Sequence, residues 1–218
     1  MMELSLIQKI AVWSLPVLFA ITVHEVAHGW VARRLGDPTA LMLGRLTLNP
    51  LKHIDPVGTV VVPLVMLLLP GGFIFGWAKP VPVTWQNLRN PKRDMALVAL
   101  AGPVANLLMA VGWGIVAKIG YIIAADIPFA GQPMVYMGSA GILINVILMV
   151  LNLLPLPPLD GGRIMTGILP GPLAYKFSRI EPYGFFILIG LLVTGILGDI
   201  LSPVVQGVLH LLYSVLSL

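Results

Sequence analysis

Four long apolar segments constrain this chain more than any other feature of its sequence. They cover residues 10–31, 95–117, 134–155 and 183–218. The hydrocarbon core of a bilayer is about 30 Å thick, and an α-helix of roughly 20 apolar residues crosses it. The last segment contains Gly198-Asp199 and Ser202-Pro203, which predict that it breaks into two helices. The pattern therefore predicts a helical protein that crosses a membrane several times.

The composition agrees with a lipid environment. Of the 218 residues, 58% are hydrophobic and 10% are charged, whereas a soluble domain carries about 25% charged residues. These values exclude a soluble globular enzyme and a disordered chain. The absence of cysteine excludes disulfides, thiolate metal sites and a cysteine nucleophile. The net charge of +4 does not indicate a nucleic-acid partner, because the basic residues lie scattered between apolar segments.

The positions of the basic residues predict the topology. A fifth apolar run, residues 58–69, would be about 18 Å long as a helix, too short to cross. If this run does not cross, 11 of the 13 basic residues lie on one side, whereas crossing would divide them five against eight. The positive-inside rule favours the first arrangement, with the basic side cytoplasmic and the N-terminus outside. We predict one domain, residues 1–218, with core helices 10–34, 95–118 and 134–155, a re-entrant segment 57–70, and C-terminal helices 183–198 and 203–217.

Two short segments between the first two core helices predict extended backbone. Residues 43–48 alternate in part between apolar and polar side chains. Residues 79–83, Lys-Pro-Val-Pro-Val, predict an edge strand or a loop, since proline cannot sit in a central strand. A strand edge here would suit an unwound peptide substrate. The expected fold class is an all-α polytopic membrane protein: a three-helix catalytic core, C-terminal helices, and short re-entrant or β segments.

The strongest chemical signal is His24-Glu25-Val26-Ala27-His28 in the first apolar helix. Residues four apart share a helix face, so both histidines can bind one metal ion. Glu25 lies one position round the helix, where it can approach a metal-bound water as a general base, the arrangement of zinc peptidases. The alternative is a polar patch at a helix end. We disfavour it because an ionised side chain at the bilayer centre costs about 2.5–3.5 kcal/mol.

A catalytic zinc site takes three protein ligands, and Asp160 is the best candidate for the third. It follows a proline-rich stretch, residues 155–158, which ends the third core helix. Broken helix at membrane depth is expected where it lines a buried cavity, and Gly161-Gly162 is expected to allow a sharp turn there. The alternative role of Asp160 is the N-cap of the next segment. The histidine pair and Asp160 meet at one depth only if the first and third core helices run in the same direction, as the non-crossing topology requires.

These motifs resemble the site-2 protease family of intramembrane zinc metalloproteases. The similarity lies in H-E-x-x-H-G-W from His24 to Trp30, in Ala101-Gly102-Pro103 with Asn106, and in Asn152 with Leu159-Asp160-Gly161-Gly162-Arg163. The segments 49–58 and 76–83 resemble a compact prokaryotic branch without a PDZ or other appended domain. The resemblance implies zinc held by His24, His28 and Asp160, with Glu25 as the base.

The resemblance also suggests roles for three further residues. Asn152 corresponds to an asparagine associated with substrate or oxyanion binding, although membrane helices also use asparagine to associate with one another. Asn106 lies behind Gly102-Pro103, and we interpret it as more structural than catalytic, with substrate contact as the alternative. His53 lies in a turn-rich loop, where it contacts substrate or forms a local hydrogen bond. We favour the local role.

The predicted function is that of an intramembrane zinc endopeptidase in the cytoplasmic membrane, with its site toward the cytoplasm. It would hydrolyse a peptide bond in the transmembrane helix of a single-pass membrane protein, by Glu25-assisted attack of zinc-bound water. Two alternatives use the same ligands: a membrane metal transporter or sensor, which needs a polar path across the bilayer, and an inactive protease-like scaffold. The sequence does not predict an oligomeric state.

Overall fold

The computed structural model describes residues 4–62 and 76–218, and every regular element within these ranges is helical. The helices are α1 (Leu6–Arg34), α2 (Thr39–Met42), α4 (Pro91–Ala124), α5 (Pro128–Asn152), α6 (Asp160–Ile168), α7 (Gly171–Ser178), α8 (Glu181–Val193) and α9 (Ile196–Leu216). Three short helices lie between α1 and α4: η1 (Pro50–Lys52), η2 (Pro56–Val61) and η3 (Trp85–Asn87).

Four of these helices, α1, α4, α5 and α9, are long and apolar enough to cross a membrane. Helix α8 is apolar but has only 13 residues, short of the roughly 20 that a spanning helix needs. The prediction of an all-helical polytopic membrane protein is therefore confirmed for the described part of the chain.

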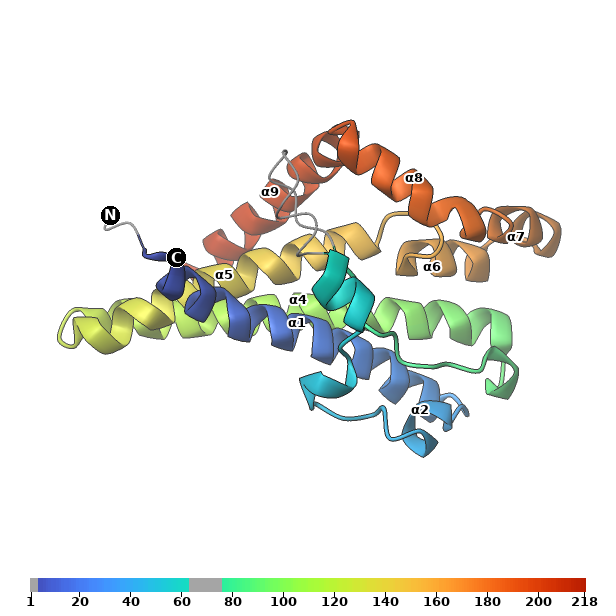
Figure 1. Ribbon diagram of the computed structural model, residues 1–218, viewed down its shortest axis with the longest axis horizontal. Helices are drawn as coiled ribbons and strands as arrows, with labels where there is room; N and C mark the ends of the chain where they lie inside the picture. Colours follow the sequence, from blue (N-terminus) through green and yellow to red (C-terminus); the bar gives the residue numbers. More distant parts are fainter. Residues whose placement is uncertain (1–3, 63–75) are drawn as a thin grey trace.

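Helices α1, α4 and α5 form the core bundle, and α9 packs on α4 and α5 (Figure 1). Helices α1 and α5 run in the same direction and α4 runs against them (Figure 1). Small residues let α4 and α5 approach closely, as is usual in membranes. A Cβ atom on Gly138 of α5 would lie only 2.6 Å from the Cβ of Ala117 on α4. The two parallel helices, α1 and α5, carry the histidine pair and lead into Asp160.

The connection from α1 to α4 starts and finishes at the same end of the bundle. The carbonyl of Leu35, just after α1, accepts a 3.1 Å hydrogen bond from the Arg89 amide, just before α4. The chain therefore returns to the side that it left, as a connection that does not cross the membrane must. The predicted re-entrant segment, residues 57–70, lies largely outside the described residues. Its described start is η2, where the Asp55 carboxylate accepts hydrogen bonds from the amides of Val57 and Gly58.

The prediction of short β segments is wrong for the described residues. Residues 43–48 form turns and bends, and residues 76–84 have no regular secondary structure, so residues 79–83 form the loop rather than the edge strand. Two prolines, Pro80 and Pro82, remove amide donors from the second segment. The amide of Lys79 donates to the carbonyl of His53 and that of Val81 to a side chain, so neither contributes to a strand ladder.

The C-terminal segment does break into two helices, but not at residues 198–203. The break lies at Gly195, which has a φ angle of 80° and separates α8 from α9. Glycine adopts this left-handed conformation without a steric penalty and commonly ends helices. Pro203, expected to begin the last helix, lies inside α9. Proline is tolerated within membrane helices because neighbouring groups satisfy the backbone that it frees.

Candidate metal centre

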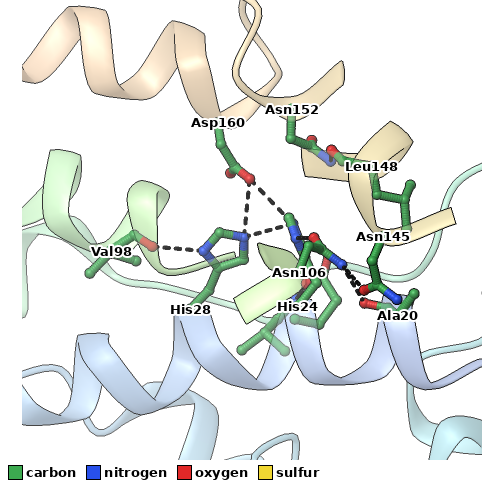
Figure 2. A network of polar contacts seen from close by, with 11 residues as sticks. Ala20, His24, His28, Val98, Asn106, Asn145, Leu148, Asn152 and Asp160 are labelled. Carbon is green, nitrogen blue, oxygen red and sulfur yellow. Dashed lines mark hydrogen bonds and ion pairs between the residues drawn. The ribbon is translucent and has the colours of Figure 1, made fainter. Parts of the chain in front are cut away.

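Three potential metal ligands from distant parts of the chain converge in the bundle (Figure 2). The Nε2 atoms of His24 and His28 lie 3.0 Å apart. Oδ2 of Asp160 lies 3.2 Å from Nε2 of His24 and 3.4 Å from Nε2 of His28. All three residues are buried, with 8%, 8% and 5% of their surface exposed. The structure thus brings together the predicted ligands.

Helix α1 presents the two imidazoles to α4 at a point where α4 has no side chain. A Cβ atom on Gly102 would lie 2.4 Å from Cε1 of His24 and 2.6 Å from both Cε1 and Nε2 of His28. Non-bonded carbon atoms essentially never approach this closely, so at this position only glycine leaves room for the histidine pair. The Gly102-Pro103 motif therefore serves the site directly.

Asp160 is the first residue of α6, directly after the turn that follows α5. Its carboxylate faces the imidazoles (Figure 2), and the N-cap position belongs to Leu159, so the capping alternative does not describe this aspartate. The expected sharp turn at Gly161-Gly162 is also not present, because both glycines lie within α6. Instead they allow close packing: a Cβ on Gly161 would lie 2.3 Å from the carbonyl oxygen of Leu153.

The other ring nitrogen of each histidine is bound to an acceptor. Nδ1 of His28 donates to the Val98 carbonyl at 2.7 Å, and Nδ1 of His24 to Oδ1 of Asn106 at 2.6 Å. The orientation of the Asn106 amide follows from its Nδ2, which donates to the Ala20 carbonyl and to Oδ1 of Asn145. Each neutral imidazole therefore carries its proton on Nδ1 and directs the Nε2 lone pair at the other ligands.

This arrangement fits a zinc ion. Two Nε2 lone pairs and a carboxylate oxygen face one another, and no donor among residues 4–62 and 76–218 bonds to the buried Oδ2 of Asp160. Three acceptors at such distances repel one another unless a cation lies between them. From the 3.0, 3.2 and 3.4 Å separations, a point equidistant from the three atoms lies about 1.9 Å from each, close to zinc–nitrogen and zinc–oxygen bond lengths of about 2.0–2.2 Å. Three protein ligands leave the fourth position open, as in catalytic zinc sites.

Glu25 lies beside the three ligands but is not one of them. Its Oε2 accepts a 2.7 Å hydrogen bond from the main-chain amide of Val81. The extended segment that carries Val81 packs on α1 at Gly29, where a Cβ atom would lie 2.9 Å from Cγ1 of Val81. Our sequence reasoning missed Val81 as a partner of the site. The available signal was Pro80-Val81-Pro82, which leaves one amide donor among three residues.

The three further residues named from the sequence lie in different settings. Asn152, the last residue of α5, is half-buried, and its Nδ2 donates to the carbonyl of Leu148 (Figure 2). Asn106 is fully buried behind His24, with its amide bonded to three partners. His53 is also buried, and its Nε2 donates to the carbonyl of Thr47 within the same loop. Our sequence reasoning also missed Asn145, which continues the Asn106 network onto α5.

A bundle of membrane-spanning helices that buries a His-His-Asp set beside a glutamate defines a membrane-embedded zinc peptidase. Comparison with known proteins agrees. Residues 116–194, which include Asp160, match the family described as peptidase family M50. YwhC of Bacillus subtilis is 38% identical over 199 residues, covering 88% of this chain and 84% of YwhC. Rip2 of Mycolicibacterium smegmatis is 31% identical over 177 residues, covering 81% of this chain and 64% of Rip2.

Rip2 of Mycobacterium tuberculosis is 30% identical over 148 residues, covering 66% of this chain and 52% of that protein. The names of all three relatives contain the words zinc metalloprotease. The chain belongs to peptidase family M50, the site-2 protease family of intramembrane zinc metalloproteases, which confirms the predicted enzyme class and cofactor. No solved structure matches the chain.

Proposed function

We propose that this protein is an endopeptidase that cleaves the transmembrane helix of a single-pass membrane protein. The observation that carries the proposal is the buried His24, His28 and Asp160 set, inside a bundle of membrane-spanning helices and next to Glu25. A site built among spanning helices is accessible to a peptide bond that lies within the bilayer. The substrate helix must unwind locally, because its carbonyls are otherwise hydrogen-bonded within the helix.

Each residue of the site has a role in this hydrolysis. His24, His28 and Asp160 would hold a zinc ion, which when bound would supply Lewis-acid chemistry to the scissile carbonyl and to the attacking water. Glu25 takes a proton from the attacking water and later transfers it to the leaving amine. Asn152 donates a hydrogen bond to the oxyanion, after its Nδ2 leaves the Leu148 carbonyl that it now contacts. The helices around the site limit the entry of bulk water.

The decisive experiment replaces Glu25 by glutamine. This change keeps the size of the side chain but removes the base, so we expect zinc binding to persist while turnover falls about 10²- to 10⁴-fold. Cleavage of a membrane-helix substrate by detergent-purified protein, with zinc content measured in parallel, tests this. A metal transporter needs no general base, so zinc flux that persists in Glu25→Gln, together with no cleavage by the wild type, would contradict the proposal.

We also propose that the basic end of the bundle faces the cytoplasm, with the N-terminus outside. The count of basic residues supports this orientation. The chain has no cysteine, so single cysteines can be introduced without a background. Asn90→Cys, before α4, and Asp126→Cys, after it, are both exposed and lie at opposite ends of that helix. In intact cells, a membrane-impermeant thiol reagent should label position 126 and not position 90; the reverse pattern inverts the topology.

A further inference from the structure

Two carboxylates, one within α1 and one in the loop after it, bind two amides of one irregular segment. We refer to residues 76–84 as the strap. Glu25 accepts the amide of Val81 at 2.7 Å, and Asp37, in the loop after α1, accepts the amide of Thr84 at 2.7 Å. The two amides are three residues apart, and the two carboxylates are twelve residues apart. The strap is thus attached to α1 and to its following loop at two points.

The strap is held by further main-chain contacts. Nη2 of Arg45 donates to the carbonyls of Lys79 and Pro80, at 2.9 and 3.3 Å. The amide of Lys79 donates to the carbonyl of His53 at 2.9 Å. Because Pro80 and Pro82 have no amide hydrogen, the hydrogen bond to Glu25 can come only from Val81 within this tripeptide. The composition of the strap therefore directs a single donor at the glutamate.

Asp37 is the anchor at the other end of the strap. It is 1% exposed. Its carboxylate accepts hydrogen bonds from the amide and the hydroxyl of Thr39, from the amide of Thr84 and from Nδ2 of Asn87, which lies in η3. These four hydrogen bonds connect the loop after α1 to the last residue of the strap and to η3. A displacement at Asp37 would move Thr84 and, through it, Val81.

The consequence for Glu25 is a fixed orientation. A glutamate side chain has several rotatable bonds, and a free carboxylate would sample many positions. The bond from Val81 occupies Oε2 and leaves Oε1 as the second oxygen of the carboxylate. A charge-assisted hydrogen bond of this kind is stronger than a neutral one. A general base acts efficiently only when it is held within hydrogen-bond reach of the proton that it abstracts.

We propose that Val81, through its main-chain amide, and Asp37, through the strap, are positioning residues for Glu25. The inference rests on the proposed role of Glu25 as general base. It assigns the strap a function in catalysis that does not depend on pairing with substrate. Both residues act through Glu25, and neither belongs to the set of metal ligands.

The first test removes the main-chain amide hydrogen of residue 81. Val81→Pro deletes the amide donor while proline still fits extended backbone, and Val81→Ala is the matched control, since it trims the same side chain but keeps the amide. We expect kcat of Val81→Pro to be about ten- to a hundredfold lower than that of Val81→Ala, with KM and zinc content similar in the two variants. Equal kcat values for the two variants would overturn the proposal.

Asp37→Asn gives a second test, at a residue in the loop after α1 that is not one of the metal ligands. This change keeps the shape of the side chain but replaces one acceptor oxygen by an NH₂ group, which cannot accept the hydrogen bonds that the Asp37 carboxylate accepts. We therefore expect kcat to fall while zinc content stays unchanged. If Val81→Pro fails to fold, this variant decides the question, and a wild-type kcat refutes the inference. Failure of the proposed function is recognised separately, because wild-type turnover in Glu25→Gln contradicts the base itself. If that variant keeps measurable turnover, adding Val81→Pro to it should cause no further loss.

Discussion

Oδ1 of Asn106 lies 2.6 Å from Nδ1 of His24, so a residue of α4 determines which nitrogen of a histidine on α1 carries the proton. Asn106 is in turn oriented by Oδ1 of Asn145 at 2.8 Å (Figure 2). Nδ2 of Asn145 donates to the Gly141 carbonyl at 2.8 Å. The hydrogen bonds thus run from α5 through α4 to α1. The hydrogen bonds that join the three core helices therefore also orient a metal ligand, His24.

We expect Asn106→Ala to weaken zinc binding about 10- to 100-fold, the usual cost of removing a partner that orients a metal-bound histidine. The substitution leaves the Nδ1 proton of His24 without an acceptor in a buried position. Competition with a chelator of known affinity measures the loss. Asn152→Ala serves as control, because the Asn152 amide donates to a carbonyl of its own helix and should affect turnover rather than zinc affinity. Equal zinc affinities for the two variants would contradict the positioning role of Asn106.

A second prediction concerns the surface of α4 against which the histidines pack. Gly102→Ala places a methyl group within 2.6 Å of both imidazoles, so the rings must move apart and zinc content should fall to a small fraction of wild type. Gly112→Ala makes the same change further along α4, where a Cβ atom would have no neighbour within 4 Å in the described part of the chain. It should retain zinc and folding. Metal analysis of both purified proteins is sufficient; full zinc content in Gly102→Ala would contradict the close packing of the two rings against this glycine.

The ligand set was predictable because its signals are local. His24 and His28 are four residues apart in an apolar segment, and Asp160 follows prolines that end a helix of matching direction. Helical spacing and the cost of charge in lipid indicate the two histidines, and the proline-broken helix together with the predicted topology indicates Asp160. The buried partners were harder to identify. Asn145 is a polar residue in an apolar helix. Its role depends on which residue of α4 it faces, and the sequence alone does not give this packing.

The errors have a common physical origin. The break at Gly195 rather than at residues 198–203 depends on which glycine adopts a positive φ angle, and the sequence offers several candidates there. Of the two alternatives for residues 79–83, the strand is wrong, because the amides of this segment bind a loop carbonyl and Glu25 instead of a neighbouring strand. In both cases tertiary contacts select among conformations that local propensity leaves nearly equal.

A third prediction follows from the three facing acceptors of the metal centre. Removing zinc leaves two lone pairs and a carboxylate within 3.4 Å of one another, so the chelated protein should be less stable than the zinc form. Zinc added at 100 times its dissociation constant should stabilise the fold by about 2.7 kcal/mol, as for any ligand that binds only the folded state. Thermal unfolding in detergent with graded zinc measures this. Asp160→Asn should show a clearly smaller stabilisation, and an equal one would exclude Asp160 as a ligand.

The last prediction concerns the pH dependence that Asp37 contributes to stability. Burial alone would raise the pKa of the Asp37 carboxyl, but hydrogen bonds from Thr39, Asn87 and Thr84 outweigh burial and hold the pKa below its ordinary value. A group with a depressed pKa in the folded state stabilises the fold at pH values above its unfolded pKa of about 3.9, and this contribution is lost as the pH falls through the folded pKa.

Asp37→Asn should therefore lower the melting temperature by on the order of 5 °C at pH 7, since it weakens several charge-assisted hydrogen bonds. The difference from wild type should shrink as the pH is lowered below about 4, because protonation removes the same charge from the wild-type protein. Asp126→Asn, at an exposed site after α4, is the control and should follow wild type throughout. A constant difference between pH 7 and pH 3 would show that the shape of the Asp37 side chain, rather than its charge, holds the strap in place.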